Sequence, residues 1–415
     1  MRAEILAIGS ELLDPDRSDT NGPFLVEGLR SVGFEVMARS MVGDEREWLE
    51  PAFRTALARA DVVISTGGLG PTEDDRTREA AAAVLGRPLV RDAEVTEALR
   101  ARFARFGWKL TPGNAKQADL VTGAKWLANP NGTAPGQWIE DGERLLILLP
   151  GPPSEMRPLF EAEVLPRLRQ RAGGRVVRSR VLRLAAVSES EVDRLVAPLY
   201  ARVDNPRTTI LSAAGEVELR FRASGATAAE ADGRIEELVS QVRDVLGDRI
   251  ASEDGRSLEE VVARLLTERG QTLALAESCT GGLLAGRLTA VPGASVFLDS
   301  TVVTYSNAAK TALIGVDADL IVRRGAVSEE VAQAMARGVR ARAGTDIGLG
   351  ITGIAGPSGG TPEKPVGLVM IALAGSAGDC VRRAVFPGDR SKVRARAVAV
   401  ALEMLRRGLL GLPQH

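Results

Sequence analysis

The fold is decided by the stretch DVVISTGGLGPTEDDRTREAAAAVLG, residues 61–86. It begins with an apolar, β-branched run, passes through a glycine-rich turn and continues with residues that favour a helix. Continuous apolar strands that alternate with helices are typical of a parallel sheet covered on both faces. We therefore predict an α/β domain over residues 1–172. Its other strands are predicted at 4–10, 36–43 and 145–151, and its other helices at 21–33 and 45–59.

Two changes of composition divide the rest of the chain. The segments 172–176 and 247–257 are rich in glycine and polar residues, as linkers are. Between them the pattern predicts a small α+β domain, 173–254, in the order β-α-β-β-α. Residues 255–415 return to α/β, so the fold class is two α/β domains joined by a small α+β domain. In the last domain we predict strands at 272–278, 300–306, 346–353 and 365–375, and a closing helix at 391–410.

Composition excludes several classes of protein. Of the 415 residues, 45% are apolar and 26% charged, the net charge is −1, and no block of like charge suggests a nucleic-acid groove. No apolar run is long enough to span a bilayer, and the N-terminus lacks the features of a signal peptide. Two cysteines do not make a disulfide framework. We expect a cytoplasmic protein that binds neither membranes nor nucleic acid.

The scarcity of histidine limits the chemistry. The only histidine is His415, the last residue, so a Ser-His-Asp triad, a Cys-His pair and a His-ligated zinc site are not expected. Carboxylates, lysine, tyrosine, hydroxyls and an oxygen-ligated metal remain. Lysine is also rare, with six against 47 arginines. A lysine near a candidate site is informative because lysine, unlike arginine, can be tuned to lose its proton.

The glycine-rich turn of the first domain is a candidate anion site. Its glycines let the backbone approach a ligand closely, and amides at the next helix start favour anions. Asp74 and Asp75 are expected at or just inside that helix. Two adjacent carboxylates repel each other unless a cation or the helix dipole compensates. The residues alone leave two interpretations open: a phosphate site with an oxygen-ligated divalent metal, or a glycine turn with an acidic helix cap.

A second strand-to-helix turn carries AESCTGG, residues 276–282. Ser278 or Cys279 could be a nucleophile there, held near amides that bind an oxyanion. Equally, Ser278 or Thr280 could cap the helix and Cys279 could be a buried apolar residue. A neutral lysine can activate a serine without histidine, which makes Lys310 a candidate base. Other groups suited to this chemistry are Tyr305, the glycine-rich loop 352–360 and Arg390.

The motifs GSELLDPDRSDTN, TGGLGPTEDD, NPNGTAPG and LPGPPSEM, in this order, resemble the molybdopterin-binding-like domain that opens the CinA family of competence/damage-inducible proteins. In two-domain family members this domain is linked to ADP-ribose pyrophosphatase activity that depends on a divalent metal and potassium. The resemblance implies Mg²⁺, Mn²⁺ or Co²⁺ near Glu11, Asp74 and Asp75, where a metal-activated water attacks phosphorus. Departures from the family pattern at Asp14-Pro15 and Val121 lie outside this acidic motif.

The same resemblance implies which residues hold the diphosphate substrate in the first domain. Asp19 is expected in the same crevice as the acidic residues. The implied substrate-binding residues are Gly9, Asn21, Thr66, Gly67, Gly68, Gly70, Asn114, Gln117, Gly132 and Thr133.

AESCTGG, VVTYSNAAK, RGAVSEE, TGIAGPSGG and KPVG, also in this order, resemble the C-terminal nicotinamide-nucleotide amidase domain of the CinA family. That domain converts nicotinamide mononucleotide to nicotinate mononucleotide and ammonia without a cofactor. The resemblance implies Ser278 as nucleophile, Lys310 as its base and Tyr305 as a helper, whereas spacing alone leaves Cys279 as a rival nucleophile. The implied substrate-binding residues are Thr280, Gly281, Asn307, Thr352, Gly353, Gly356 and Arg390, the last for the 5′-phosphate.

The middle domain resembles the KH-like module of longer CinA family members. It lacks the G-x-x-G loop that clamps a nucleic-acid backbone, so we expect a spacer or dimerisation role. Together the resemblances imply a homodimeric pyridine-nucleotide hydrolase acting on nicotinamide mononucleotide and ADP-ribose. Two alternatives remain, because fold does not determine function: a molybdopterin-binding protein, and a competence-related partner protein with little catalysis.

Overall fold

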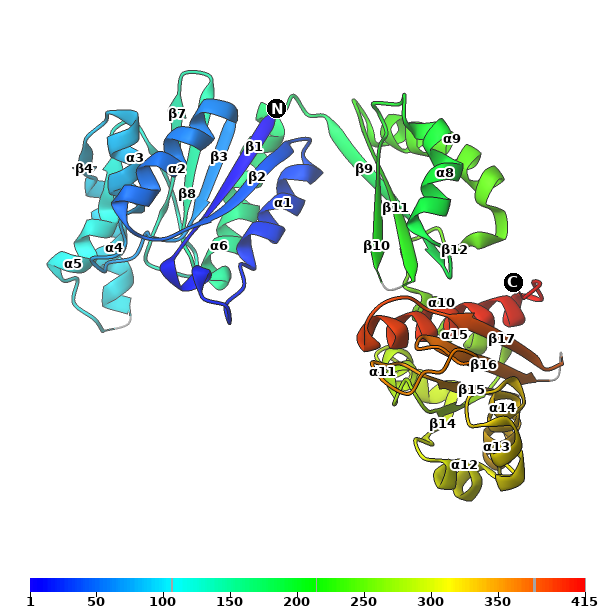
Figure 1. Ribbon diagram of the computed structural model, residues 1–415. Coiled ribbons are helices and arrows are strands. Elements are labelled where there is room, and N and C mark those ends of the chain that lie inside the picture. The colour runs from blue at the N-terminus through cyan, green and yellow to red at the C-terminus, as the bar shows by residue number, and fades with distance from the viewer. Residues whose placement is uncertain (106, 214, 376–377, 415) are drawn as a thin grey trace. The chain divides into compact units, whose positions relative to one another are not determined.

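The computed structural model describes residues 1–105, 107–213, 215–375 and 378–414. The chain forms two compact units, residues 1–178 with 224–232 and residues 179–223 with 233–415. Figure 1 labels the helices and strands of both units. The glycine-rich turn at 67–70 belongs to the first unit, and the turn at 276–282 belongs to the second.

The first unit is built on a six-stranded sheet in the order β2-β1-β3-β8-β7-β6. The first four strands are parallel, as their apolar runs predict. β7 and β6 are antiparallel to their neighbours, which the prediction of a parallel sheet did not anticipate. Only two residues, Gly142 and Glu143, separate β7 from β8, and so short a connection joins antiparallel strands. The strands are β1 (Arg2–Ile8), β2 (Glu35–Val42), β3 (Val62–Thr66), β6 (Lys125–Leu127), β7 (Gly136–Asp141) and β8 (Arg144–Leu149).

Helices cover both faces of this sheet, as predicted. Neighbouring residues of a strand point to opposite faces, so Ile5 packs in a core with α1 and α6, and Leu6 packs in a second core with α2 and α3. The helices are α1 (Asn21–Ser31), α2 (Arg46–Arg59), α3 (Thr77–Leu85), α4 (Ala93–Arg105), α5 (Pro112–Ala115), α6 (Pro153–Leu159) and α7 (Leu165–Arg171). Strands β4 (Leu89–Arg91) and β5 (Asp119–Val121) form a separate two-stranded sheet.

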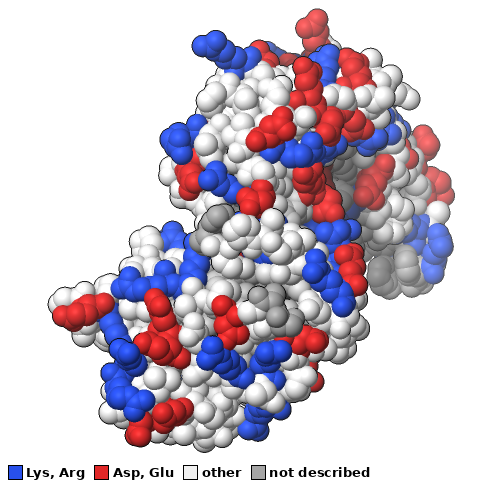
Figure 2. All heavy atoms as spheres, turned by 90° about the vertical axis from the view of Figure 1, so that its right-hand side faces the viewer, with Lys and Arg blue, Asp and Glu red and all other residues white. Residues whose placement is uncertain are grey.

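The middle domain confirms the predicted order β-α-β-β-α up to residue 246, but a fourth strand, β12, pairs with β9 within the segment 247–257 that was predicted as a linker. Its sheet has the order β10-β11-β9-β12, and alternate residues of β11, among them Leu219 and Phe221, are buried. On the face drawn in Figure 2, lysine and arginine side chains are interspersed with acidic ones. The elements are β9 (Val176–Ala185), α8 (Glu189–Tyr200), β10 (Arg207–Ala213), β11 (Glu216–Gly225), α9 (Ala228–Leu246) and β12 (Ile250–Ser252).

The C-terminal domain is a second α/β sheet, in the order β14-β13-β15-β16-β17. Strands β14, β13 and β15 are parallel, and β16 and β17 run antiparallel to their neighbours. Leu275 packs on α10, α11 and α15, and Ala276 packs on α14 on the other face. The strands are β13 (Leu273–Glu277), β14 (Leu298–Val303), β15 (Ile347–Gly353), β16 (Leu368–Gly375) and β17 (Cys380–Val385). The helices are α10 (Leu258–Arg269), α11 (Leu283–Thr289), α12 (Asn307–Ile314), α13 (Ala318–Arg324), α14 (Glu329–Ala343) and α15 (Arg390–Leu410).

A buried ionic cluster joins the middle domain to α15. Arg406 donates two hydrogen bonds to the Glu403 carboxylate, at 2.7 and 2.8 Å, and a third to the Asp248 carbonyl oxygen at 2.6 Å. Arg407 pairs with the Asp248 carboxylate at 2.6 Å. Removing one member of this cluster would leave a buried charge unpaired. The cluster therefore fixes the position of β12 relative to α15. Within the described ranges, we find no helix with the length and apolarity that crossing a membrane requires.

Candidate functional sites

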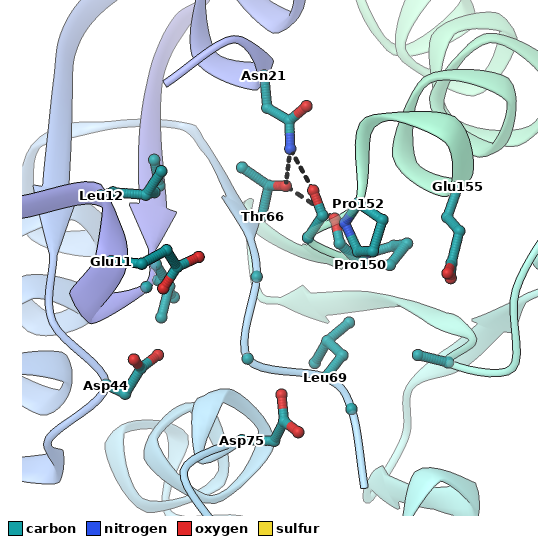
Figure 3. A pocket seen from close by; sticks show the side chains of 18 of the residues that line it. Glu11, Leu12, Asn21, Asp44, Thr66, Leu69, Asp75, Pro150, Pro152 and Glu155 are labelled. Atoms are coloured by element: carbon teal, nitrogen blue, oxygen red, sulfur yellow. Dashed lines mark hydrogen bonds between the residues drawn. The ribbon is translucent and has the colours of Figure 1, made fainter. Parts of the chain in front are cut away.

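A cavity of about 610 Å³ opens where β1, β3 and β8 end, in the first unit. Open α/β sheets bind ligands at this edge. Figure 3 shows Glu11 and Asp44 together on one side of the cavity, Asn21 and Thr66 on another, and Glu155 on an adjoining helix. The residues named from the sequence that line it are Gly9, Glu11, Asp19, Asn21, Thr66, Gly67, Gly68, Gly70, Asp74, Asp75, Gln117 and Thr133.

Two residues implied as substrate ligands are not brought to this cavity. Asn114 accepts a hydrogen bond from the Thr111 hydroxyl at 2.5 Å within a short helical turn. Gly132 lines a smaller cavity beside α4, and its amide donates to Asn129 Oδ1 at 2.8 Å. Neither residue is among those that line the main cavity, although Gly132 lies against the Glu155 side chain, which does line it. Their role as substrate ligands stays a prediction.

The glycine-rich turn is packed against the end of β1. Gly67 has φ of 111°, and a Cβ atom there would lie 2.0 Å from the Ile8 carbonyl oxygen. Only glycine fits this position. The hydroxyl of Thr77, the first residue of α3, donates to the Gly67 carbonyl oxygen at 2.8 Å. The backbone itself therefore forms this wall of the cavity.

A buried polar network supports the cavity from the other side. The Asn21 side-chain amide donates to the Thr66 hydroxyl at 3.0 Å and to the Gly151 carbonyl oxygen at 2.7 Å, and the Thr66 hydroxyl donates to the Pro150 carbonyl oxygen at 2.8 Å (Figure 3). Asn21 Oδ1 is buried without a hydrogen-bond partner among the described residues. A buried acceptor without a partner is costly, so this oxygen is available to a ligand donor.

The two adjacent aspartates precede α3. The helix begins at Thr77, so the expectation that Asp74 and Asp75 lie at or just inside it is wrong. The Asp75 carboxylate accepts the Thr72 amide at 2.9 Å and also the Thr72 hydroxyl. This local turn competes with helix formation and delays the start of α3.

The carboxylates of the cavity fit a cation that binds together with its ligand. In the part of the chain that the structure describes, no three Asp, Glu, His or Cys side chains gather as a metal site. Glu11, Asp44 and Asp75 nevertheless line the same cavity. Mg²⁺ is commonly held by one or two carboxylates with substrate phosphates and water, and oxygen donors suit it. The donor set therefore fits a divalent cation that arrives with a phosphate ligand.

Arg78 lies directly beneath the glycine-rich turn, and sequence analysis missed it. It is 1% exposed, and it donates to the carbonyl oxygens of Leu69 at 2.6 Å and Gly70 at 2.9 Å. Burial lowers its pKa, and the negative charges of Glu79, Asp75 and Asp119 oppose that shift. The two carbonyl oxygens and these carboxylates stabilise the buried cation, so Arg78 supports the turn from behind. The only signal in the sequence is an arginine on the apolar side of a predicted helix.

Glu155, at the start of α6, is a second residue that sequence analysis did not single out. It lines the cavity, and its carboxylate accepts the Asn129 side-chain amide at 2.7 Å. The NPNGTAPG and LPGPPSEM motifs are thereby joined in space. The motif match contained both residues, but only the tertiary contact shows that they act together.

In the C-terminal domain, Ser278 and Lys310 meet. Lys310 Nζ donates to Ser278 Oγ at 3.1 Å and to the Thr304 carbonyl oxygen at 2.8 Å. Ser278 follows β13, and Lys310 lies on α12, which Ser306 caps by accepting the Ala309 amide at 3.0 Å. Lys310 is 1% exposed, and burial lowers its pKa. This arrangement presents a nucleophilic hydroxyl beside an amine that can become neutral.

Cys279 has the environment of an apolar residue. It is 6% exposed and belongs to the main core of its domain. Burial, with a smaller effect of the Glu277 charge, raises the pKa of its thiol to about 11. The thiolate is the reactive form of cysteine, so these surroundings favour Ser278 over Cys279 as nucleophile.

The helix after the AESCTGG turn is capped by Glu277. Gly282 precedes the first residue of α11, so neither Ser278 nor Thr280 is its N-cap. The Glu277 carboxylate accepts the amides of Gly282 at 3.1 Å, Leu284 at 3.2 Å and Ala285 at 2.9 Å. The expectation that amides at this helix start hold an oxyanion is therefore wrong for these three, because a carboxylate of the chain already occupies them.

Tyr305 and Arg390 form a pair at the rim of this site. Arg390 donates to the Tyr305 hydroxyl at 2.6 Å and to the Gly356 carbonyl oxygen at 2.9 Å. Tyr305 is 60% exposed, and no described contact joins it to Lys310. Arg390 therefore links the Tyr305 junction to the second glycine-rich loop.

The other implied ligands of the C-terminal domain lie on α12, on β15 and just after β13. Asn307 is exposed at the first turn of α12. Thr352 is buried on β15 and donates to the Ala326 carbonyl oxygen at 2.9 Å, beside Gly353. Thr280 is buried, and its carbonyl oxygen accepts Arg394 at 2.6 Å, next to Gly281, whose φ is 60°. These hydrogen bonds hold Thr352 and Thr280 in place.

The fold and the two sites define a multidomain protein in which one α/β domain carries a cavity at the ends of its parallel strands and another carries a Ser-Lys contact. Three family models match the chain. Residues 4–170 match the probable molybdopterin binding domain, residues 179–250 the damage-inducible protein CinA KH domain, and residues 255–409 the CinA C-terminal domain. The chain belongs to the CinA family.

Full-length relatives agree with this assignment. A CinA-like protein of Acidobacterium capsulatum is 45% identical over 414 residues, which are 99% of this chain and 100% of that protein. A putative competence-damage inducible protein of Thermoanaerobacter pseudethanolicus is 44% identical over 99% of both chains. Among solved structures, the competence damage-inducible protein A (ComA) from Klebsiella pneumoniae is 41% identical, covers 37% of this chain and 95% of its own, and has a TM-score of 0.36.

Proposed function

We propose that the C-terminal domain is an amidase that converts nicotinamide mononucleotide to nicotinate mononucleotide and ammonia. The observation that carries the proposal is the 3.1 Å contact between Lys310 Nζ and Ser278 Oγ at a buried lysine. Because burial lowers the pKa of Lys310, more of the amine is neutral and able to accept a proton. Serine and lysine together replace the histidine that the chain lacks here.

The reaction proceeds through an acyl-enzyme. Neutral Lys310 accepts the Ser278 proton while Oγ attacks the carboxamide carbon. The C–N bond then breaks, and the proton held by Lys310 passes to the leaving nitrogen, which departs as ammonia. A water molecule attacks the resulting ester and gives a proton to Lys310. Ser278 takes that proton back as the carboxylic acid leaves.

Arg390 is proposed to hold the 5′-phosphate of the substrate. Its guanidinium is already fixed by the Gly356 carbonyl oxygen at 2.9 Å and by the Tyr305 hydroxyl. Arginine suits phosphate because it offers several donors in a planar fork. Tyr305 would then act as a helper by positioning the phosphate-binding arginine.

The test is an assay of the full-length protein with nicotinamide mononucleotide and no added metal, with ammonia and nicotinate mononucleotide measured. Ser278→Ala and Lys310→Ala should abolish the reaction, and Cys279→Ala should retain it. No activity in the unmodified protein would overturn the proposal. Activity lost only in Cys279→Ala would reassign the nucleophile.

For the N-terminal domain we propose hydrolysis of ADP-ribose to AMP and ribose 5-phosphate with a divalent cation. The support is one cavity that combines the glycine-rich turn with the carboxylates of Glu11 and Asp75, while the buried Arg78 holds the Leu69 carbonyl oxygen of that turn. A cation held by these carboxylates would neutralise the diphosphate and activate a water molecule. Glu11→Gln and Asp75→Asn should lose ADP-ribose hydrolysis measured with Mg²⁺, Mn²⁺ or Co²⁺, whereas Ser278→Ala should keep it.

A pterin-binding role is the second candidate for this domain. Its support is the match of residues 4–170 to the probable molybdopterin binding domain. This candidate predicts that the protein binds molybdopterin in calorimetry and leaves ADP-ribose intact with every metal. A partner-protein role without catalysis predicts instead that Ser278→Ala and Lys310→Ala change no measured function.

A further inference from the structure

The residue before the proposed nucleophile has no role in the mechanism above. Glu277 is the last residue of β13, and it is 1% exposed. It forms no ion pair with a lysine or arginine of the described residues, which is unusual for a buried carboxylate. We propose that Glu277 is a positioning residue that holds Ser278 Oγ and Lys310 Nζ at hydrogen-bonding distance. The inference rests on the proposed amidase function and names a further residue that the same site requires.

The Glu277 side chain fixes the turn that carries Ser278. Its two oxygens accept three backbone amides, of Gly282, Leu284 and Ala285, at 2.9 to 3.2 Å. The carboxylate thereby ties the end of β13 to the first turn of α11, and Ser278 lies between the two. The negative charge is also favourable at the amino end of a helix. The proposed nucleophile therefore lies on a loop whose two ends are joined by the Glu277 side chain.

The Glu277 main chain fixes the lysine. Its carbonyl oxygen accepts the Thr304 amide at 2.8 Å, and the Thr304 carbonyl oxygen accepts Lys310 Nζ at 2.8 Å. Two hydrogen bonds through Thr304 therefore connect Glu277 to the Lys310 amine, and a peptide bond connects Glu277 directly to Ser278. A displacement of Glu277 would change the distance between Oγ and Nζ. Misplacement of reacting groups by about 1 Å can reduce a rate by about 100-fold.

The occupied helix start also limits where the substrate binds. Because the Glu277 carboxylate uses the amides of residues 282, 284 and 285, neither the phosphate nor the developing oxyanion can use them. A negative charge next to the nucleophile also disfavours a thiolate at Cys279. Glu277 therefore contributes to the choice of serine over cysteine in this turn.

The test compares Glu277→Gln with Glu260→Gln. Glutamine keeps one carbonyl acceptor and places an NH₂ group against backbone N–H donors, so the cap is lost in part. Glu260 caps α10 in the same domain by accepting the Ser257 amide at 2.7 Å, and it lies outside the proposed site. Glu277→Gln should lose more thermal stability than Glu260→Gln, because Glu277 is buried and accepts three amides whereas Glu260 is exposed; kcat is therefore measured at a temperature at which both variants are folded. Glu277→Gln should lower kcat for nicotinamide mononucleotide by about 100-fold with KM within about 3-fold, and Glu260→Gln should change neither.

A second readout separates this inference from the proposed substrate. A fluorophosphonate reacts with an activated serine whatever its natural substrate, so the rate of Ser278 labelling should fall in Glu277→Gln and not in Glu260→Gln. If the unmodified protein is labelled but does not deamidate the nucleotide, the substrate is wrong and the role of Glu277 stands. If Glu277→Gln does not fold, Glu277→Asp keeps the charge, cannot reach all three amides, and should give an intermediate loss. Unchanged labelling and kcat in a folded Glu277 variant would overturn the inference.

Discussion

The hydroxyl of Tyr305 accepts a hydrogen bond from Arg390 at 2.6 Å, although the two residues are 85 positions apart in the chain. Tyr305 lies just before α12 and Arg390 is the first residue of α15, so the contact links two sequence motifs of the C-terminal domain. The exposed tyrosine is thus bound to a cation at the rim of the site and not to the buried lysine. The proposal that Arg390 binds the 5′-phosphate starts from this contact.

We predict that Arg390→Met discriminates between substrates with and without the phosphate. A charge-assisted hydrogen bond contributes about 1.5–3 kcal/mol, so KM for nicotinamide mononucleotide should rise by about 10- to 100-fold. The value of kcat/KM for nicotinamide riboside should stay within about 3-fold, because that substrate has no phosphate. Tyr305→Phe should act in the same direction and more weakly. Equal losses for both substrates would show that Arg390 serves the reacting centre.

The pH dependence of the amidase should report the lysine. Lys310 must be neutral to accept a proton, and its burial lowers the pKa from the ordinary 10.5. The value of kcat/KM should therefore rise with pH and level off with a midpoint below 10.5. Lys310→Arg should be inactive at every pH because arginine does not lose its proton. A rising limb centred above 10.5 would contradict the assignment of the base.

The thiol of Cys279 should be inert at neutral pH. Burial raises its pKa to about 11, and the thiolate is the reactive form. Iodoacetamide at pH 7.5 should modify Cys279 in less than about 1% of the time-matched yield obtained after unfolding. Prior modification of the folded protein should leave the amidase rate unchanged. Rapid alkylation that removes activity would point to a reactive thiol.

Arg78 should control anion binding in the N-terminal cavity. It is buried below the glycine-rich turn and holds two carbonyl oxygens of that turn. Arg78→Met should weaken the binding of ADP-ribose by about 10-fold or more in calorimetry, since the turn that lines the cavity loses two hydrogen bonds from a buried charged group. Arg100→Met is the control, because Arg100 lies in the same unit in an exposed pair with Glu97. Equal binding by both variants would remove Arg78 from the site.

Gly67 should be the least replaceable glycine of the first unit. A Cβ atom there would meet the Ile8 carbonyl oxygen at 2.0 Å with φ of 111°, so Gly67→Ala should cost about 3–4 kcal/mol. Gly142→Ala is the control, because it has φ of 60° and open space, and it should cost about 1 kcal/mol. Unfolding in urea followed by tryptophan fluorescence reports this unit alone, since it contains all four tryptophans: Trp48, Trp108, Trp126 and Trp138. Equal losses of unfolding free energy in the two variants would show that the backbone around Gly67 shifts to make room for the Cβ atom.

The sequence by itself determined the α/β class, the order of the middle-domain elements up to residue 246 and Ser278, Cys279 and Lys310 as the candidate reactive residues. These follow from local signals: apolar runs, turn glycines and short motifs that lie on one element each. The parallel strands at 62–66 and 273–277 were predicted for this reason. Histidine scarcity, which needs no structure, removed histidine from the candidate bases and made a lysine near a candidate site informative.

Only the tertiary structure decided which of these residues act together. The contact of Ser278 with Lys310 spans 32 positions. The contact of Arg78 with Leu69 forms only because α3 packs against the glycine-rich turn that precedes it. The antiparallel strand β7, the late start of α3 at Thr77 and the capping of α11 by Glu277 were also not predicted. Each depends on a hydrogen-bond partner or a burial that the pattern of one segment does not contain. The sequence specifies which chemical group a side chain carries, but the residues that pack against it determine its pKa and its hydrogen-bond partners.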